Sequence, residues 1–187
     1  MKHQYAEKVP FVYDRNKLRE ITERIVREEN LFNVPTPISW VKKEHRHALL
    51  DTLGIEYGST IFSVNAKCVN IACLRPGQRS AIHKDIDFNQ EFTTIALNVP
   101  VTECKQVIMN WYDVKPGRQI KEIVSARGWK IPGLSLHESV CKFTIQANKP
   151  FVVNPSYFHD VANLGNHPEL IISIRDRARD TDEKYNV

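Results

Sequence analysis

The sequence predicts a mainly β protein of the jelly-roll type, preceded by two helices. The N-terminal third has apolar residues at helical spacing. From about residue 60 the pattern changes to short runs rich in Val, Ile, Phe and Thr, separated by Pro, Gly and Asn. Short strands in such number, with no helices between them, favour a sandwich or jelly roll over alternating βαβ units.

Two helices are expected before the strands. In residues 18–26 apolar side chains recur every three or four positions with charged residues between them, as in an amphipathic helix. Asp14 or Asn16 can cap its start. A second helix is predicted over residues 41–53, with Gly54 as its C-terminal stop.

The strands are predicted from runs of β-branched and aromatic residues bounded by turn residues. These runs are residues 60–64, 68–74, 93–99, 107–112, 142–146, 151–153 and 170–175.

Residues 113–141 contain several Pro and Gly residues and are expected to form a long insertion, a loop over the mouth of the site. We therefore expect a single domain, residues 1–187. Residues 1–59 would form a helical support, and residues 60–176 a β core that includes the insertion.

Composition and charge narrow the class of protein. Hydrophobic residues make up 42% and charged residues 26% of the 187 residues, close to a globular average. No apolar run reaches the roughly 18 residues of a membrane span, and the charged start is unlike a signal peptide, so a cytoplasmic protein is expected. Four scattered cysteines are expected to be reduced. The net charge of +4 is spread out, so neither a membrane nor a nucleic acid is expected as partner.

The first chemically informative motif is His83-Lys84-Asp85. In an extended strand, residues i and i+2 point to the same face, so imidazole and carboxylate would lie side by side. This pair can be a metal chelate, a base with its orienting acid, or a coincidence.

The second motif is in residues 151–163, where an apolar strand breaks at Asn154-Pro155 and leads to His159. A jelly roll brings an early strand carrying His83 beside a late strand carrying His159. Two histidines and one carboxylate, here Asp85, form a facial triad with three open positions, which suits non-haem Fe(II) oxygen chemistry.

With these residues the chain resembles the 2-oxoglutarate/Fe(II)-dependent oxygenases. Residues 74–85, with a Pro-Gly turn before His-x-Asp, look like the metal-binding strand of that superfamily. Residues 150–163 are similar to its distal-histidine strand, and residues 170–175 to its closing strand. Residues 96–101 and 110–112 resemble those of small phage-type and aspartyl/prolyl hydroxylase-like members.

The resemblance covers about residues 68–175 and implies a double-stranded β-helix, the cupin-like form of the jelly roll. It implies that His83, Asp85 and His159 bind Fe(II), with 2-oxoglutarate as cosubstrate and O₂ as oxidant. The implied activity is that of a dioxygenase, hydroxylating a small molecule, an amino acid or a protein side chain. The substrate and the oligomeric state are not readable from the sequence.

One position departs from the family pattern. A basic residue usually follows the second histidine by roughly ten positions and pairs with the distal carboxylate of 2-oxoglutarate, but here that position is Glu169. Arg175 lies on the same face of the predicted strand and can replace it, with Ser173 adding a hydroxyl. The alternative is that Arg175 is a surface residue at the start of a basic tail.

Other polar residues have weaker assignments. Asn110 and Tyr112 alternate with Trp111, so either the first two or Trp111 would enter the barrel. A cosubstrate-binding role for Asn110 and Tyr112 competes with simple packing. His137 and His167 lie in predicted loops and are expected to be exposed.

Two alternative functions remain open. The first is a cupin-like metal-binding module without oxygenase activity, which Glu169 favours. The second is a nucleic-acid demethylase of the same fold. Ala72 and Leu74 argue against it, because that branch tends to carry polar pocket residues there, and so does the lack of a concentrated basic groove.

Overall fold

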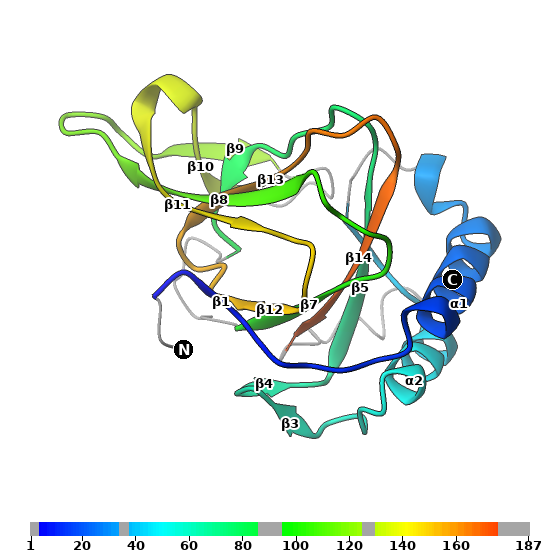
Figure 1. The fold of residues 1–187 in the computed structure, drawn as a ribbon. Coiled ribbons are helices and arrows are strands. Elements are labelled where there is room, and N and C mark those ends of the chain that lie inside the picture. Colours follow the sequence, from blue (N-terminus) through cyan, green and yellow to red (C-terminus); the bar gives the residue numbers. More distant parts are fainter. Residues whose placement is uncertain (1–3, 34–37, 86–94, 125–129, 176–187) are drawn as a thin grey trace.

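The computed structural model describes residues 4–33, 38–85, 95–124 and 130–175, and two antiparallel sheets form its body (Figure 1). The first sheet contains, in spatial order, β1 (Ala6–Lys8), β12 (Phe151–Val153), β7 (Ala96–Pro100), β14 (Glu169–Arg175), β5 (Cys68–Leu74) and β2 (Ile38–Trp40). The second contains β11 (Ser139–Gln146), β8 (Val107–Val114), β13 (Phe158–Asn163), β6 (Ile82–His83), β10 (Lys130–Leu134) and β9 (Lys121–Val124). The remaining elements are α1 (Arg15–Glu28), η1 (Leu31–Asn33), α2 (Lys43–Thr52), β3 (Thr60–Ile61), β4 (Val64–Asn65) and η2 (Leu136–Glu138).

The chain crosses repeatedly between the two sheets, from β5 to β6, β7 and β8, and again from β11 to β12, β13 and β14. This alternation is the double-stranded β-helix, so the predicted jelly roll is confirmed. The inner faces share one apolar core, with Ala72, Phe151 and Ile171 from the first sheet and Met109 and Trp111 from the second. Burial of these side chains holds the two sheets together.

Both helices cover the outer face of the first sheet (Figure 1). Their apolar residues pack against outward-facing side chains such as Ile71 and Ile172. The Asp14 side chain caps α1 by accepting a hydrogen bond from the Lys17 amide at 3.0 Å. Gly54 follows α2 with a φ of +67°, a conformation that glycine adopts without strain. The two predicted helices and their end signals are therefore confirmed.

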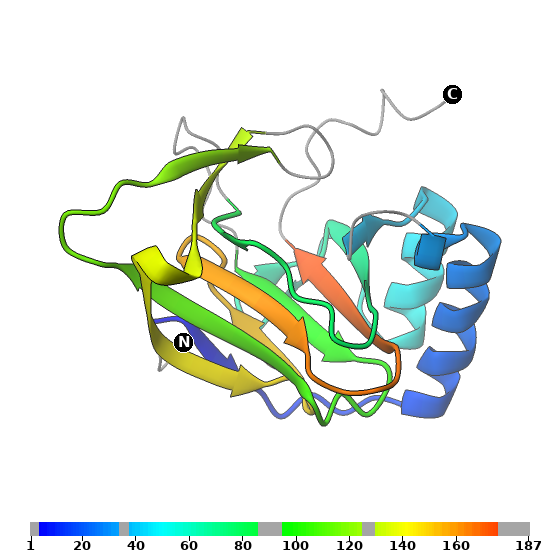
Figure 2. The same ribbon diagram turned by 90° about the horizontal axis from the view of Figure 1, so that it is seen from above.

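Two of the predicted segments were wrong in detail. Residues 60–64 do not form one strand but the hairpin β3–β4, because Phe62 and Ser63 both have positive φ. Residues 113–141 are not a plain loop, because they contain the β9–β10 hairpin and η2. Figure 2 shows this hairpin extending from the second sheet, away from the helices.

Pro132 and Gly133 explain the second error, because they lie inside β10 rather than at a turn. The Pro132 carbonyl still accepts a hydrogen bond, from the Lys84 amide at 3.1 Å. A Cβ atom at Gly133 would lie 2.6 Å from Cγ2 of Ile123, so glycine is required for β9 to pack there. The hairpin is thus bonded to the segment that carries the first motif.

Two further expectations can be compared with the structure. All four cysteines are free thiols, as predicted, with Cys68, Cys73 and Cys104 buried and Cys141 exposed. Among the described residues, no helix has both the length and the apolar character needed to cross a bilayer.

Candidate metal centre

Two neighbouring strands of the second sheet present the two histidines on one face. β6 pairs with β13 so that His83 lies directly opposite His159, with ring centroids 4.6 Å apart. On its other side, β13 pairs His159 with Trp111 of β8, which belongs to the core between the sheets. Because directly opposed residues share a face, both imidazoles point toward the interior of the jelly roll.

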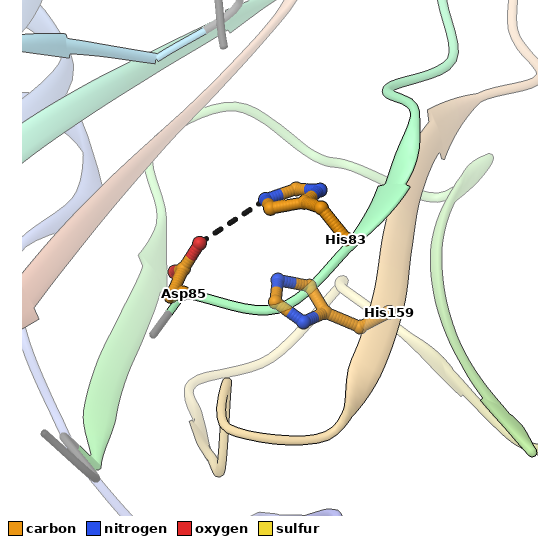
Figure 3. Close-up of side chains that lie close together, drawn as sticks. All are labelled: His83, Asp85 and His159. Carbon is orange, nitrogen blue, oxygen red and sulfur yellow. Dashed lines mark ion pairs between the residues drawn. The ribbon is translucent and has the colours of Figure 1, made fainter. Parts of the chain in front are cut away.

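Asp85 completes the cluster from just beyond the end of β6. Its amide donates a hydrogen bond to the Pro155 carbonyl at 2.9 Å, which fixes the backbone after the strand. Its Oδ1 lies 3.1 Å from Nε2 of His83, and Figure 3 shows the three side chains converging. One ligand atom from each of His83, Asp85 and His159 lies within 4.8 Å of the other two, so the group could hold a metal ion.

Backbone carbonyls orient both imidazole rings. Nδ1 of His83 is 2.8 Å from the Ala81 carbonyl, and Nδ1 of His159 is 2.9 Å from the Tyr157 carbonyl. A carbonyl only accepts hydrogen bonds, so each Nδ1 carries a proton. Nε2 of each ring therefore points toward the cluster, the arrangement that orients histidine ligands of metals, and at His83 this nitrogen contacts Asp85.

The electrostatics of the cluster keep His159 and Asp85 ready to bind a cation, whereas His83 has to lose a proton that Asp85 stabilises. Burial, together with the nearby His83, lowers the pKa of His159 to about 4, so its ring is neutral at pH 7. Burial also lowers the pKa of His83, but the hydrogen bond and charge of Asp85 outweigh it and raise that pKa. Burial would raise the pKa of Asp85, yet Arg175 and the His83 hydrogen bond hold it well below the ordinary value.

Arg175 connects the closing strand to this cluster. Its Nη1 lies 2.5 Å from Oδ2 of Asp85, and its Nε donates to Oγ of Ser173 at 3.2 Å. Arg175 and Ser173 therefore share the inner face of β14, as the alternation predicted. The contact with Asp85 was not predicted, and it leaves Oδ1 of that carboxylate on the side of His83.

Asn110 and Tyr112 do not join the cluster. Both side chains donate hydrogen bonds to Asp160, from Nδ2 of Asn110 at 2.7 Å and from the Tyr112 hydroxyl at 3.0 Å. Nε of Arg79 lies 2.6 Å from the same carboxylate. Asp160 follows His159 in β13 and so faces the opposite side of the sheet. The sequence left open whether Trp111 or the pair Asn110 and Tyr112 faces inward, and in the structure Trp111 faces inward. We call Asp160, Arg79, Tyr112 and Asn110 the Asp160 network.

Glu169 also lies apart from the cluster, at the opposite end of β14 from Arg175. Its Oε2 accepts a hydrogen bond from the Thr102 hydroxyl and another from the Cys104 amide at 3.2 Å. His137 and His167 are exposed, as predicted. Glu169, which stands where the family pattern has a basic residue, therefore stabilises a turn and does not face His83, Asp85 and His159.

The donor set fits a divalent transition metal. Two neutral imidazole nitrogens and one carboxylate oxygen are the ligands that Fe(II) takes in facial triads, and the three remaining positions stay open to other ligands. Because Arg175 offsets the negative charge of Asp85, a bound divalent cation would keep a positive charge that an anionic ligand at the open positions could balance.

Comparisons with solved structures show the fold. A non-heme alpha-ketoglutarate-dependent carbocyclase, SnoK from nogalamycin biosynthesis, matches with a TM-score of 0.53 and 12% identity over 93% of this chain and 80% of that chain. The non-heme monooxygenase ThoJ matches with a TM-score of 0.53 and 10% identity over 92% of this chain and 73% of that chain. No protein-family model and no curated protein sequence matches this chain. The chain thus has the fold of these enzymes.

Proposed function

We propose that this protein is an Fe(II)- and 2-oxoglutarate-dependent oxygenase that hydroxylates a small molecule, an amino acid or a protein side chain. The observation that carries the proposal is the convergence of His83, Asp85 and His159 on the inner face of a double-stranded β-helix. The order of these ligands along the chain and their strands match the motif that the sequence resembles.

Each residue of the cluster has a definite part in this proposal. His83 and His159 would bind Fe(II) through Nε2, since Nδ1 of each ring is hydrogen-bonded to the backbone. Asp85 would bind through Oδ1, because Arg175 holds Oδ2. When bound, Fe(II) together with 2-oxoglutarate and O₂ would supply the oxidation of a substrate C–H bond, coupled to decarboxylation of 2-oxoglutarate to succinate.

Arg175 is the proposed cationic contact for the cosubstrate. A guanidinium group carries five N–H donors, and the hydrogen bonds to Asp85 and Ser173 use only two of them. The remaining donors can bind a carboxylate that enters beside the metal. A buried carboxylate without a cationic or hydrogen-bonding partner would cost several kcal/mol.

The position of Glu169 favours a second candidate, a metal-binding module without oxygenase activity. In the family that the sequence resembles, a basic residue at this position binds the cosubstrate. Here the acidic side chain caps a turn at Thr102 and Cys104. If Arg175 does not take over that role, the cluster would bind a metal but no 2-oxoglutarate.

Calorimetry under anaerobic conditions can separate the two candidates. The oxygenase proposal predicts that 2-oxoglutarate binds to the Fe(II)-loaded protein but not to the metal-free protein. On admission of O₂, succinate should form slowly even without substrate. An Asp85→Ala variant should lose both signals, whereas a variant of exposed His137, His137→Ala, should keep them. Metal binding without any 2-oxoglutarate binding would support the second candidate and contradict the first.

A further inference from the structure

A series of aromatic rings in contact leads from the metal cluster to the surface. Trp111 lies directly opposite His159 in the β8–β13 pairing, and their ring centroids are 6.4 Å apart. Tyr5, just before β1, stacks on Trp111 at 6.3 Å and meets Tyr157 edge to face at 5.1 Å. These separations are those of aromatic pairs in contact. We call Trp111, Tyr5 and Tyr157 the aromatic row.

Exposure to solvent increases along the aromatic row. Trp111 is fully buried, Tyr5 is 7% exposed and Tyr157 is 37% exposed. Phe143 packs beside the middle of the row, with its ring centroid 6.0 Å from that of Tyr5 and 5.7 Å from that of Trp111. One end of the row therefore lies in the core beside a metal ligand, and the other end reaches water.

Hydrogen bonds fix the order of the rings. Nε1 of Trp111 donates to the Asn154 carbonyl at 3.3 Å, and the Asn154 amide donates to the Tyr5 carbonyl at 2.8 Å. The Tyr157 carbonyl lies 2.9 Å from Nδ1 of His159, whose proton it accepts. Three segments that are far apart in the sequence are thus held together at the row.

The chemical types in the row are more specific than packing requires. An apolar side chain of similar volume would fill each buried position equally well. Indole and phenol rings, however, lose an electron far more readily than the benzene ring of phenylalanine. Oxidisable rings in contact, beginning at a ligand of the metal and ending at the surface, provide a path for single electrons.

We propose that the aromatic row conducts electrons from the surface to the metal centre when an oxidant forms there and no substrate consumes it. This inference rests on the proposed function, which supplies that oxidant from O₂. The row would spare the ligand His159 and the neighbouring core from oxidation.

The electrons and protons of this step balance. Tyr157 loses one electron, which passes through Tyr5 and Trp111 to the metal centre, and its phenolic proton goes to water. A neutral tyrosyl radical remains at the surface. Two such electrons, with two protons, return an oxidant that lies two electrons above Fe(II) and water to Fe(II) and water. A one-electron reductant in solution, such as ascorbate, restores the phenol by giving back an electron and a proton.

Substitutions by phenylalanine test the row with little change of shape. Tyr157→Phe removes the donor at the surface, and Tyr5→Phe interrupts the row in its middle. Tyr57→Phe is the matched control, because Tyr57 is 44% exposed and its ring contacts His47 of α2. Asp85→Ala removes a metal ligand and therefore reports any oxidation that does not begin at the metal.

The measurement is electron paramagnetic resonance of the Fe(II)-loaded full chain, frozen rapidly after mixing with hydrogen peroxide. Peroxide supplies two oxidising equivalents to the metal without 2-oxoglutarate. The parent should form a tyrosyl radical that ascorbate removes, and a nitroso spin trap with mass spectrometry should locate it at Tyr157. In Tyr157→Phe the radical should stay on buried Tyr5 and resist ascorbate. In Tyr5→Phe an indolyl radical of Trp111 should replace it.

The controls and the remaining outcomes decide the matter. Tyr57→Phe should behave as the parent does, and Asp85→Ala should form no radical in the row. A radical trapped at Tyr157 in Tyr5→Phe would contradict conduction through the rings. The parent's radical in Asp85→Ala, or no radical in the parent, would also overturn the inference.

Two further results complete the test. If Tyr5→Phe is not folded by circular dichroism, Tyr157→Phe decides alone, and a radical that ascorbate still removes from it overturns the inference. Succinate formation from 2-oxoglutarate is measured separately on the parent. Its absence, together with the radical at Tyr157, would contradict the oxygenase proposal and still support the aromatic row as an electron path.

Discussion

The two faces of the second sheet carry two polar clusters that differ in how their hydrogen bonds are used. On the outer face, the fully buried carboxylate of Asp160 is bonded to Arg79, Tyr112 and Asn110. On the inner face, His83, Asp85 and His159 direct ligand atoms toward one another. A saturated cluster stabilises the fold, because every donor has its acceptor. A cluster of converging ligand atoms is instead suited to binding a cation.

The same strands carry residues of both clusters. β13 carries His159 inward and Asp160 outward, and β8 carries Trp111 inward and Tyr112 outward. Beside them, Ser80 just before β6 exchanges hydrogen bonds with Val161 of β13. The outer cluster therefore holds together the segments whose inner faces present the histidines.

The largest effect on stability is expected from Asp160→Ala. Removing this carboxylate leaves the Tyr112 hydroxyl and the Asn110 amide without their acceptor and breaks the Arg79 ion pair. The free energy of unfolding of the metal-free protein should fall by about 3 kcal/mol. Chemical denaturation measures it, with His159→Ala as the comparison, which should cost less stability and lose the metal. Equal destabilisation by the two variants would remove the distinction between the faces.

Arg175→Ala should affect the inner cluster in two ways. Loss of the charge should weaken 2-oxoglutarate binding by about 1.5–3 kcal/mol, the scale of a charge-assisted hydrogen bond. Loss of the contact with Asp85 should also lower metal affinity. The expected loss is about 10–100-fold, as when a residue that is hydrogen-bonded to a metal ligand is removed. Titrations with metal alone and then with 2-oxoglutarate separate the two. The exposed Arg118→Ala is the control, and a variant indistinguishable from it would make Arg175 a surface residue.

Tyr112→Phe tests the assignment of Tyr112 to the outer face. Burial, then the negative charge of Asp160, raises the pKa of Tyr112 to about 12, so its hydroxyl stays protonated and donates to that carboxylate. Deleting the hydroxyl should cost about 1 kcal/mol of unfolding free energy. Metal and 2-oxoglutarate affinities should not change. A selective loss of 2-oxoglutarate binding would instead place Tyr112 in the cosubstrate site.

The smallest effect is expected from Glu169→Gln. Glutamine can still accept the hydrogen bonds from Thr102 and Cys104, so stability should fall by less than about 1 kcal/mol. The affinity for 2-oxoglutarate should stay the same, because Glu169 lies at the far end of β14 from Arg175. A marked gain in affinity would show that the acidic charge reaches the cosubstrate.

The sequence predicts the elements best where burial is complete. Residues 68–74 and 151–153 were predicted with the observed bounds of β5 and β12, whose residues are all buried and β-prone. The β9–β10 hairpin was missed because Pro132 and Gly133 signal a turn in most contexts. Here a carbonyl contact and the lack of a Cβ atom, both tertiary effects, place them within a strand.

For the site, the sequence predicted the three side chains that the structure brings together but not which way their neighbours face. β8 is buried on both faces over most of its length, so polarity does not distinguish inside from outside. The assignment of Asn110 and Tyr112 could not be decided for this reason.

The most direct test of the account is a metal-binding titration of single variants at the inner cluster. His83→Ala, Asp85→Ala and His159→Ala should each lower the affinity for Mn(II) or Co(II). Each loss should exceed about 10–100-fold, the range expected when a residue that only contacts a metal ligand is removed. The exposed His137→Ala should bind as the parent does. Circular dichroism should confirm that each variant is folded. We expect loss of the metal in all three variants, and full retention of metal in any two of them would contradict a metal site formed by His83, Asp85 and His159.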